Sequence, residues 1–387
     1  MNSQSVLDEA GDQFVSVANA WANVAIDDLC ADVFSGGTPL TSRPDYYVNG
    51  NIPWLKTKEV NHRRIYTTEN YITQLGLESS SAKLVPANSV TVAMYGDGQT
   101  AGRVGLTKIP LATNQACCNL IIDRRIADPE FVFYQLVDAY ESLVARKTGS
   151  GQQNLNGQII RSFKIPLPPL LEQQAIASVL SSLDEKIDLL HRQNKTLEAM
   201  AEALFRQWFV EEAGAEWREG TVEELFVLQR GFDLPAQSRT EGPYPIFAAS
   251  GFSGGHVEYK VKGPGVTTGR SGLLGKVFLV LEDFWPLNTS LYVKEFRLGT
   301  PLFAYQFLKT LDLMAFNAGS AVPTLNRNHV HSEKVVLPPR ELIDRFEATM
   351  QPVFQKIEHN ASQRLSLEKL RDALLPKLMS GEVRVAY

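Results

Sequence analysis

The sequence predicts an α+β fold with an internal repeat, in which two mixed α/β domains are each followed by one long helix. Three observations predict it. Two segments 170 residues apart match without a gap, and each runs into a long heptad pattern. Each is also preceded by a stretch with the short strands and frequent turns of a mixed domain. At 387 residues, the chain is long enough for more than one hydrophobic core.

The repeat is clearest where GSGQQNLNGQIIRSFKIPLPP (149–169) matches GSAVPTLNRNHVHSEKVVLPP (319–339). Asn156 aligns with Asn326, both Leu-Pro-Pro triplets align, and the same register continues into the following helices. A register this long, with its prolines in place, indicates duplication followed by divergence.

Apolar residues in both helices recur at alternating spacings of four and three, which is the period of a coiled-coil seam. The predicted seam positions are Ile176, Leu180, Leu183, Ile187, Leu190, Leu197 and Leu204, and then Phe346, Met350, Val353, Ile357, Leu367 and Leu374. Asn194 and Asn360 also fall on the seam, where polar residues lower stability but fix the register. The alternative is two amphipathic helices that each cover the sheet of their own domain.

Composition shifts divide the chain into five segments. We predict an N-terminal tail, a first domain, a first long helix, a second domain, and a second long helix with a C-terminal tail, at 1–24, 25–165, 166–214, 215–338 and 339–387. The three cysteines have no metal-ligand spacing, which favours a reducing cytoplasm, and no apolar run is long enough for a membrane span.

Two different domains held at a fixed separation by paired helices are suited to reading a split DNA site. The net charge of −5 gives no global indication of nucleic acid, so binding would depend on local clusters of Lys and Arg. The approximate two-fold repeat could also present two similar surfaces to two copies of one partner.

The sequence resembles the specificity subunit of type I restriction–modification enzymes over nearly its whole length. The resemblance is carried by SGGTP (35–39), IPWLKTKEV (52–60), ATNQA (112–116), IPLPPLLEQQAIASVLSSLDEKID (165–188) and KTLEAMAEALFRQWFV (195–210). It implies two target-recognition domains joined by two helices in an antiparallel coiled coil. The second half departs from the pattern, because QRGFDLP replaces SGGTP and no IPW follows.

The resemblance also implies partners. These are double-stranded DNA, two modification subunits that methylate adenine with S-adenosylmethionine, and restriction subunits that translocate DNA with ATP and Mg. The chain itself would have no catalytic role, cofactor or metal.

The sequence itself offers no catalytic motif. It lacks a P-loop and the Asn/Asp-Pro-Pro-aromatic tetrapeptide of adenine methyltransferases. Asp184, Glu185 and Lys186 are consecutive on a predicted helix, so their side chains do not converge as a nuclease site requires. Two alternatives stay open: a coiled-coil scaffold that binds only proteins, and a self-contained DNA methyltransferase.

Candidate DNA contacts are side chains in the turns and loops that can reach base edges or phosphates. In the first domain they are Lys56, Lys58, Arg63, Arg64, Gln99, Thr100, Arg103, Gln152, Gln153 and Asn154. In the second domain they are Arg230, Thr268, Arg270, Ser271, Lys276, Thr324, Asn326 and Arg327. Asn114 and Asn288, which lie between apolar residues in ATNQA and PLNTS, are interpreted as buried turn-forming residues first and DNA contacts second.

Overall fold

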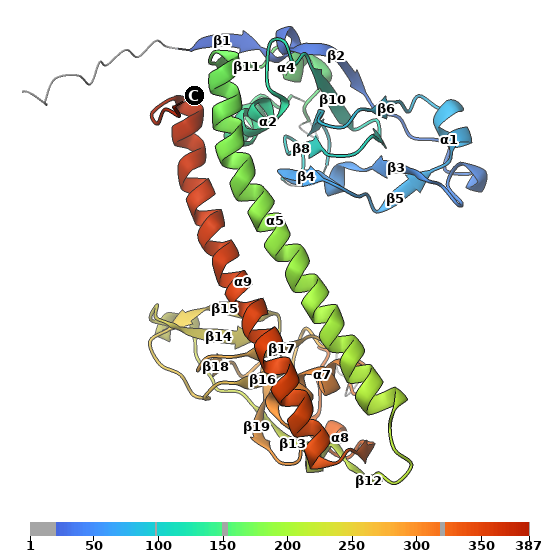
Figure 1. The fold of residues 1–387 in the computed structure, drawn as a ribbon, viewed down its shortest axis with the longest axis vertical. Helices are drawn as coiled ribbons and strands as arrows, with labels where there is room; N and C mark the ends of the chain where they lie inside the picture. The colour runs from blue at the N-terminus through green and yellow to red at the C-terminus, as the bar shows by residue number, and fades with distance from the viewer. Residues whose placement is uncertain (1–20, 97–98, 149–153, 318–321, 387) are drawn as a thin grey trace, which may run out of the picture. The chain divides into compact units, whose positions relative to one another are not determined.

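The computed structural model describes residues 21–96, 99–148, 154–317 and 322–386, which form two compact units. One unit contains the described residues up to 187 together with those from 366, and the other contains residues 188–365. The long helices α5 (Leu170–Arg206) and α9 (Arg340–Ser380) each contribute one part to each unit (Figure 1).

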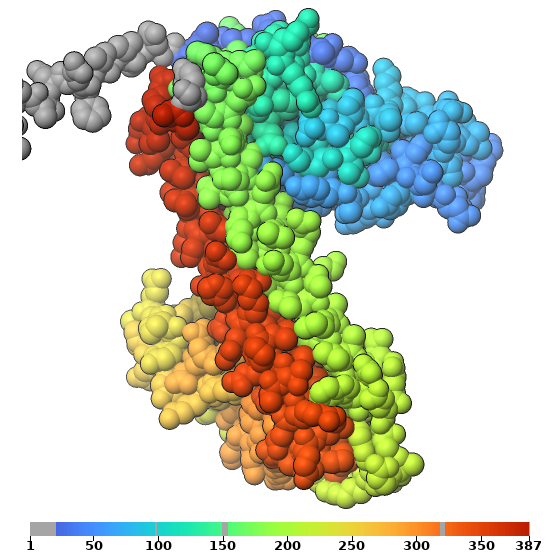
Figure 2. Space-filling model, in the orientation of Figure 1, coloured from blue at the N-terminus to red at the C-terminus, as the bar shows by residue number. Residues whose placement is uncertain are grey.

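The first unit is built on two β-sheets. One has the strand order β2 (Cys30–Ser35), β10 (Cys117–Ile122), β7 (Val90–Ala93), β8 (Val104–Thr107) and β4 (Arg63–Ile65). The other has the order β5 (Asn70–Ile72), β3 (Ile52–Leu55), β9 (Leu111–Thr113) and β6 (Leu84–Val85). Strands β3 and β5 lie with α1 (Gln74–Glu78) in a lobe that projects from the rest of this unit (Figure 2).

Helix α2 (Pro129–Asp138) covers the five-stranded sheet. It begins where the Asp128 carboxylate accepts hydrogen bonds from the backbone N–H groups of Glu130 and Phe131, and Pro129 suits the first helical position. Its buried residues join those of β7, β8 and β10 in the main core of this unit. The short helices α3 (Tyr140–Val144) and α4 (Gly157–Arg161) follow it along the chain.

The first domain begins and ends in a strand pair. Strand β1 (Ala22–Ala25) pairs antiparallel with β11 (Lys164–Leu167). The predicted tail at 1–24 is therefore too long, because β1 starts at Ala22 and Trp21 packs edge-on against Phe131 at 6.5 Å.

The second unit repeats this plan. Its larger sheet has the order β13 (Phe226–Arg230), β19 (Ser290–Phe296), β16 (Gly265–Gly269) and β17 (Val277–Val280). Its smaller sheet has the order β15 (Gly251–His256), β14 (Tyr244–Ala248) and β18 (Trp285–Pro286), and β12 (Arg218–Thr221) pairs with β20 (Lys334–Leu337). The helices are α6 (Val222–Leu225), α7 (Pro301–Thr310), which packs on β16 and β17, and α8 (Arg327–His331).

The two domains therefore match strand for strand in most of their topology. The order β2-β10-β7-β8 corresponds to β13-β19-β16-β17, and α2 corresponds to α7. The parallel pair β3–β9 corresponds to the parallel pair β14–β18. The repeat seen in the sequence thus extends into regions where the sequences have diverged.

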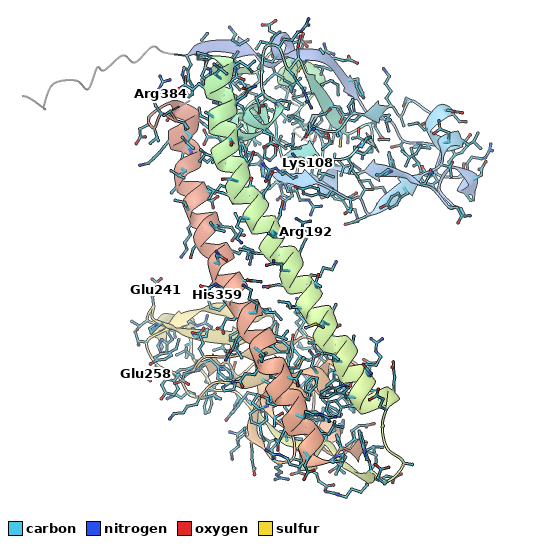
Figure 3. All side chains as sticks on the ribbon, viewed as in Figure 1. Lys108, Arg192, Glu241, Glu258, His359 and Arg384 are labelled. Carbon is cyan, nitrogen blue, oxygen red and sulfur yellow. The ribbon has the colours of Figure 1, made fainter. Side chains whose placement is uncertain are left out.

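Within each unit, α5 and α9 run antiparallel. In the first unit, Asp184 of α5 forms an ion pair with Arg371 of α9 at 2.9 Å, and Arg384, beyond the end of α9, bonds Glu172 near the start of α5 (Figure 3). In the second unit, Phe205 of α5 packs against Phe346 of α9, with 5.6 Å between ring centres. The predicted α+β fold with an antiparallel helix pair is confirmed.

The predicted seam residues face inward. Six of them are buried, namely Ile176, Leu180, Ile187, Leu190, Phe346 and Met350. The others are half-buried, namely Leu183, Leu197, Leu204, Val353, Ile357, Leu367 and Leu374. The same helices also join the cores of the domains, since Ile176 and Leu378 belong to the core of the first domain, and Phe205 and Phe346 to that of the second. Both interpretations of the heptads therefore describe part of the packing.

Candidate nucleic-acid interface

In the first domain, two of the predicted loops meet at the end of the five-stranded sheet. The backbone N–H of Leu155 donates to the carbonyl of Met94 at 3.1 Å, which ties the segment before α4 to the loop between β7 and β8. Gln99, Thr100 and Arg103 lie in that loop, and Asn154 immediately precedes Leu155. Gln152 and Gln153 lie outside the described residues.

The second domain builds the same junction. The N–H of Leu325 donates to the carbonyl of Arg270 at 2.8 Å, and the N–H of Gly272 donates to the carbonyl of Pro323 at 3.0 Å. Leu325 aligns with Leu155 in the repeat, and Arg270 follows β16 as Met94 follows β7. Both domains therefore hold a hairpin loop against the segment before a short helix.

This junction in the second domain is concave and cationic. A cavity of about 440 Å³ is lined by Arg230, Arg270, Leu291, Thr324, Leu325, Asn326 and Arg327. Five of these seven residues were predicted from sequence as DNA contacts. Three guanidinium groups at one concave site favour a polyanion with planar or bidentate acceptors, such as phosphates or guanine edges.

Hydrogen bonds hold two of these arginines in place. Arg230 forms an ion pair with Asp233 at 3.0 Å, and Asp233 also accepts a hydrogen bond from the side-chain amide of Asn288. The backbone carbonyl of Asn288 in turn accepts from Arg270 at 3.3 Å. Asn288 is thus a turn residue that organises the site, but it and Asn114 are half-buried and not buried as predicted. Asp233 is a participant that the sequence prediction missed, although its i,i+3 spacing from Arg230 could have indicated it.

Arg327 is more open than its neighbours. It is exposed, and no ion pair of its side chain is found within the described part of the chain. Asn326 has a structural role, since its Oδ1 accepts from the N–H of Asn328 and caps α8. Asn156, its partner in the repeat, caps α4 in the same way. Ser271 and Thr324 form a β-bridge beside them, and Lys276 is exposed immediately before β17.

The predicted cations of the first domain are distributed along the segment between β3 and β4. Lys56 stacks over Trp54 and donates to Asn70, Lys58 forms an exposed ion pair with Glu69 at 2.5 Å, and Arg63 donates to the Glu59 carbonyl. Arg103 lies apart from this segment along the chain, in the loop between β7 and β8. His62 connects this segment to the β7–β8 loop. Its ring lies 5.0 Å from that of Tyr140, and the Tyr140 hydroxyl donates to the Gln99 carbonyl. Burial, followed by the charge of Arg103, lowers the pKa of His62.

Two of the predicted contacts are wrong on grounds of burial. The Arg64 side chain is 1% exposed and bonds Glu130, Tyr134 and the carbonyl of Ser181, so it cannot reach DNA. Thr268 is fully buried in β16 and donates to the Lys276 carbonyl. For the remaining residues, contact with DNA stays a prediction.

The sequence motifs of the first domain pack on one another. The N–H of Gly37 donates to the Thr113 carbonyl at 2.8 Å, and the Trp54 ring nitrogen donates to the Gly37 carbonyl at 3.1 Å. A Cβ on Gly36 would lie 2.2 Å from the Thr113 carbonyl oxygen, so this approach requires glycine. Gly231 of QRGFDLP makes the equivalent contact in the second domain, where a Cβ would lie 2.2 Å from the Leu287 carbonyl oxygen.

Comparison with known proteins identifies the family. The sequence model of the type I restriction modification DNA specificity domain matches residues 19–199 and again residues 214–368. The chain belongs to this family. The two matched segments each contain one of the two topologically equivalent domains.

Relatives in the type I specificity family match over different lengths. The MjaIX specificity subunit of Methanocaldococcus jannaschii is 26% identical, and the alignment covers 94% of each chain. The EcoR124I/EcoR124II specificity subunit of Escherichia coli is 30% identical over 39% of this chain and 38% of its own length. The crystal structure of a type I S subunit from M. genitalium has the same fold, with a TM-score of 0.69 over 94% of this chain and 97% of its own, at 20% identity.

Metal ligands and membrane-spanning helices were sought among the described residues. Among them there is no group of three His, Cys, Asp or Glu side chains that could hold a metal ion. None of their helices is both long and apolar enough to cross a membrane.

Proposed function

We propose that this specificity-family chain reads a bipartite DNA site, with each domain recognising one half. The observation that carries the proposal is the shared junction, in which a leucine N–H ties the pre-helix segment to the hairpin loop in both domains. Equivalent loops with different side chains suit two half-sites of different sequence. In the second domain, the arginines of the cavity supply the phosphate and base contacts.

The proposal includes the partners. Two modification subunits would use S-adenosylmethionine to methylate adenine in the halves selected by this chain, and restriction subunits would act on unmodified DNA with ATP and Mg in the cytoplasm. The internal two-fold repeat supports two copies of one partner, because each half offers an equivalent surface. The chain would recognise DNA and leave the chemistry to these subunits.

A methylation map tests the proposal. The chain is co-expressed with its cognate modification subunit, and methyladenine is located by sequencing the host DNA. We expect a split motif with two short defined halves and a fixed gap. A continuous motif would contradict the bipartite arrangement. No methylation from a complex that assembles and binds cofactor would favour the scaffold alternative, and methyl transfer by the pure chain would favour the methyltransferase alternative.

Variants locate the contacts. Arg327→Ala and Arg103→Ala should each weaken specific binding by the assembled complex about tenfold or more, as expected for the loss of a base or phosphate contact. Arg192→Ala is the matched control, because Arg192 is an exposed cation on the helix α5 and not a residue of either loop junction (Figure 3). Full affinity in both loop variants would show that these residues do not contact DNA.

A further inference from the structure

The two domains differ at one edge of their larger sheets. In the first domain, β8 is covered by β4, which pairs parallel to it through Arg63–Ile65 and Gly105–Thr107. In the second domain, β17 is the equivalent of β8. Within the described residues β17 is an edge strand, with β16 as its only neighbour in the sheet.

A groove lies along this open edge. Its volume is about 410 Å³, and its walls come from β17 and the residues after it, from β14 and β15, and from α5, α7 and α9. The walls are largely apolar and aromatic, including Phe247, Phe278, Tyr305 and Phe354. Phe252, at its rim, is 69% exposed, which is unusual for a phenylalanine on a folded domain.

The groove corresponds in position to the site that β4 fills in the first domain. There, Arg64 of β4 reaches Tyr134 of α2, and Tyr134 donates to Asp184 of α5 at 2.6 Å. In the second domain, Tyr305 of α7 packs on Phe354 of α9 at 5.6 Å, and both line the groove beside β17. Phe354 aligns with Asp184 in the repeat. The equivalent helices are therefore present beside β17 with aromatic in place of hydrogen-bonded side chains, and no counterpart of β4 is found among the described residues.

The charge around the groove is negative. Glu198, Glu282 and Glu358 line it, and no ion pair of these three carboxylates is found among the described residues. Lys309, whose ammonium lies 5.2 Å from the ring centre of Tyr305, is bonded to Glu202. Burial, followed by the charge of Glu358, raises the pKa of Glu282, as expected for a partly buried carboxylate near a second one.

We propose that this groove binds an extended, positively charged segment of a partner protein, which adds a strand to β17. An exposed strand edge offers unpaired N–H and C=O groups to such a segment, and adjacent pockets select its side chains. The apolar side chains of the segment would occupy the aromatic walls, and its Lys or Arg would face Glu282 and Glu358. The first domain already contains such an arrangement, because β4, which pairs with the edge of β8, has the basic and apolar sequence Arg-Arg-Ile.

The test uses the full chain and a peptide with the sequence of residues 61–67, NHRRIYT, which contains β4. We expect saturable binding by fluorescence anisotropy, and slower hydrogen exchange at the amides of residues 277–281. Glu282→Arg/Glu358→Arg should weaken binding at least about tenfold, which corresponds to about 1.4 kcal/mol. Glu341→Arg is the control, because it reverses the charge of an exposed residue near the start of α9. This variant should bind the peptide as the unmodified chain does.

Three outcomes would overturn the proposal. One is the absence of exchange protection at residues 277–281 with about 1 mM peptide, a concentration that detects even weak binding. Another is equal affinity for a peptide in which both arginines are replaced by glutamate. The third is self-association of the chain that protects β17 without peptide, because the occupant would then be a second copy. None of these measurements uses DNA. Their outcome therefore tests the groove independently of the proposed DNA recognition, which the methylation map tests.

Discussion

Asn360 donates a hydrogen bond from Nδ2 to Oδ1 of Asn194 at 2.9 Å, and Asn360 is fully buried between α9 and α5. Asn194 in turn donates to the carbonyl of Ile357 at 2.9 Å. Polar seam residues were expected to fix the register of the helix pair, and this side-chain hydrogen bond joins the two helices at one position. The hydrogen bond between the two asparagines thus fixes the register of α5 and α9 at the seam position that lacks apolar side chains.

Asn360→Leu should destabilise the second unit by about 1–3 kcal/mol, because it leaves Oδ1 of the half-buried Asn194 without its donor. The double variant Asn194→Leu/Asn360→Leu should recover much of that loss, since an apolar pair can pack there. Urea denaturation of both single variants and the double variant gives the coupling energy. Additive losses would show that the two residues act independently.

Arg64→Met should reduce stability and leave specific DNA affinity per folded molecule unchanged. Glu130 would keep Lys108 as a partner at 2.8 Å but would lose Arg64, and loss of one member of a buried ion pair costs about 3–5 kcal/mol. Arg63→Met, at the exposed neighbour, is the control for stability. If Arg64→Met unfolded like the parent chain but bound DNA poorly, the structural role assigned to Arg64 would be wrong.

His331 should make the second domain less stable in acid. Its Nε2 accepts a hydrogen bond from the N–H of Leu228 at 2.8 Å, which requires an unprotonated nitrogen, and burial lowers the pKa of His331 below 6.5. The unfolded chain gains a proton near pH 6.5 while the folded chain does not. This contribution is therefore complete above that pH and declines as pH falls from it toward the folded-state pKa.

The measurement is the urea midpoint of the second unit from pH 7.5 to 5, a range that spans histidine titration at about pH 6.5. His331→Gln should flatten this dependence, and the exposed His329→Gln should not. If the urea midpoint depended on pH equally in the two variants, His331 would not be the cause of the acid sensitivity.

Gly231→Ala should cost about 1–3 kcal/mol, the usual range for overpacking. The added methyl would lie 2.2 Å from the Leu287 carbonyl oxygen and 2.5 Å from that of Pro286, and both are backbone atoms that cannot rotate away. Gly157→Ala is the control, because a Cβ there meets no atom within 4 Å. Equal melting temperatures for the two variants would contradict the close approach.

Arg327→Ala should reduce the salt dependence of binding by the assembled complex. An arginine that neutralises one phosphate contributes about one unit to the slope of log K against log salt. Filter binding at a series of salt concentrations measures that slope. An unchanged slope with weaker affinity would assign Arg327 to a base edge and not to a phosphate.

The long helices were predictable from the sequence. The heptad pattern follows directly from helix geometry, and the same seam positions recur in every heptad along the helix. The matching sheet topology was not predictable, because strands tolerate many side chains as long as one face stays apolar. Only the fold reveals that β2-β10-β7-β8 and β13-β19-β16-β17 are equivalent.

Two of the predicted contact residues lie in strands and are buried, whereas five others line one cavity. Arg63 and Arg64 are adjacent and chemically identical, but successive side chains of β4 point to opposite faces, so the first is exposed and the second buried. Thr268 is similar, because every residue of β16 is buried. Arg230 at the end of β13, Arg270 after β16 and Arg327 at the start of α8 were candidates because glycines and polar residues mark the ends of elements, but only the fold shows that they share a cavity.

The paired strands that bound each domain have an evolutionary consequence. Because β1 lies beside β11, and β12 beside β20, the chain enters and leaves each domain at adjacent points. A recombination event between those strands would replace a whole domain without altering the helices on either side. New recognition sequences could then arise by exchange of intact modules between genes, with no need for gradual change within a loop.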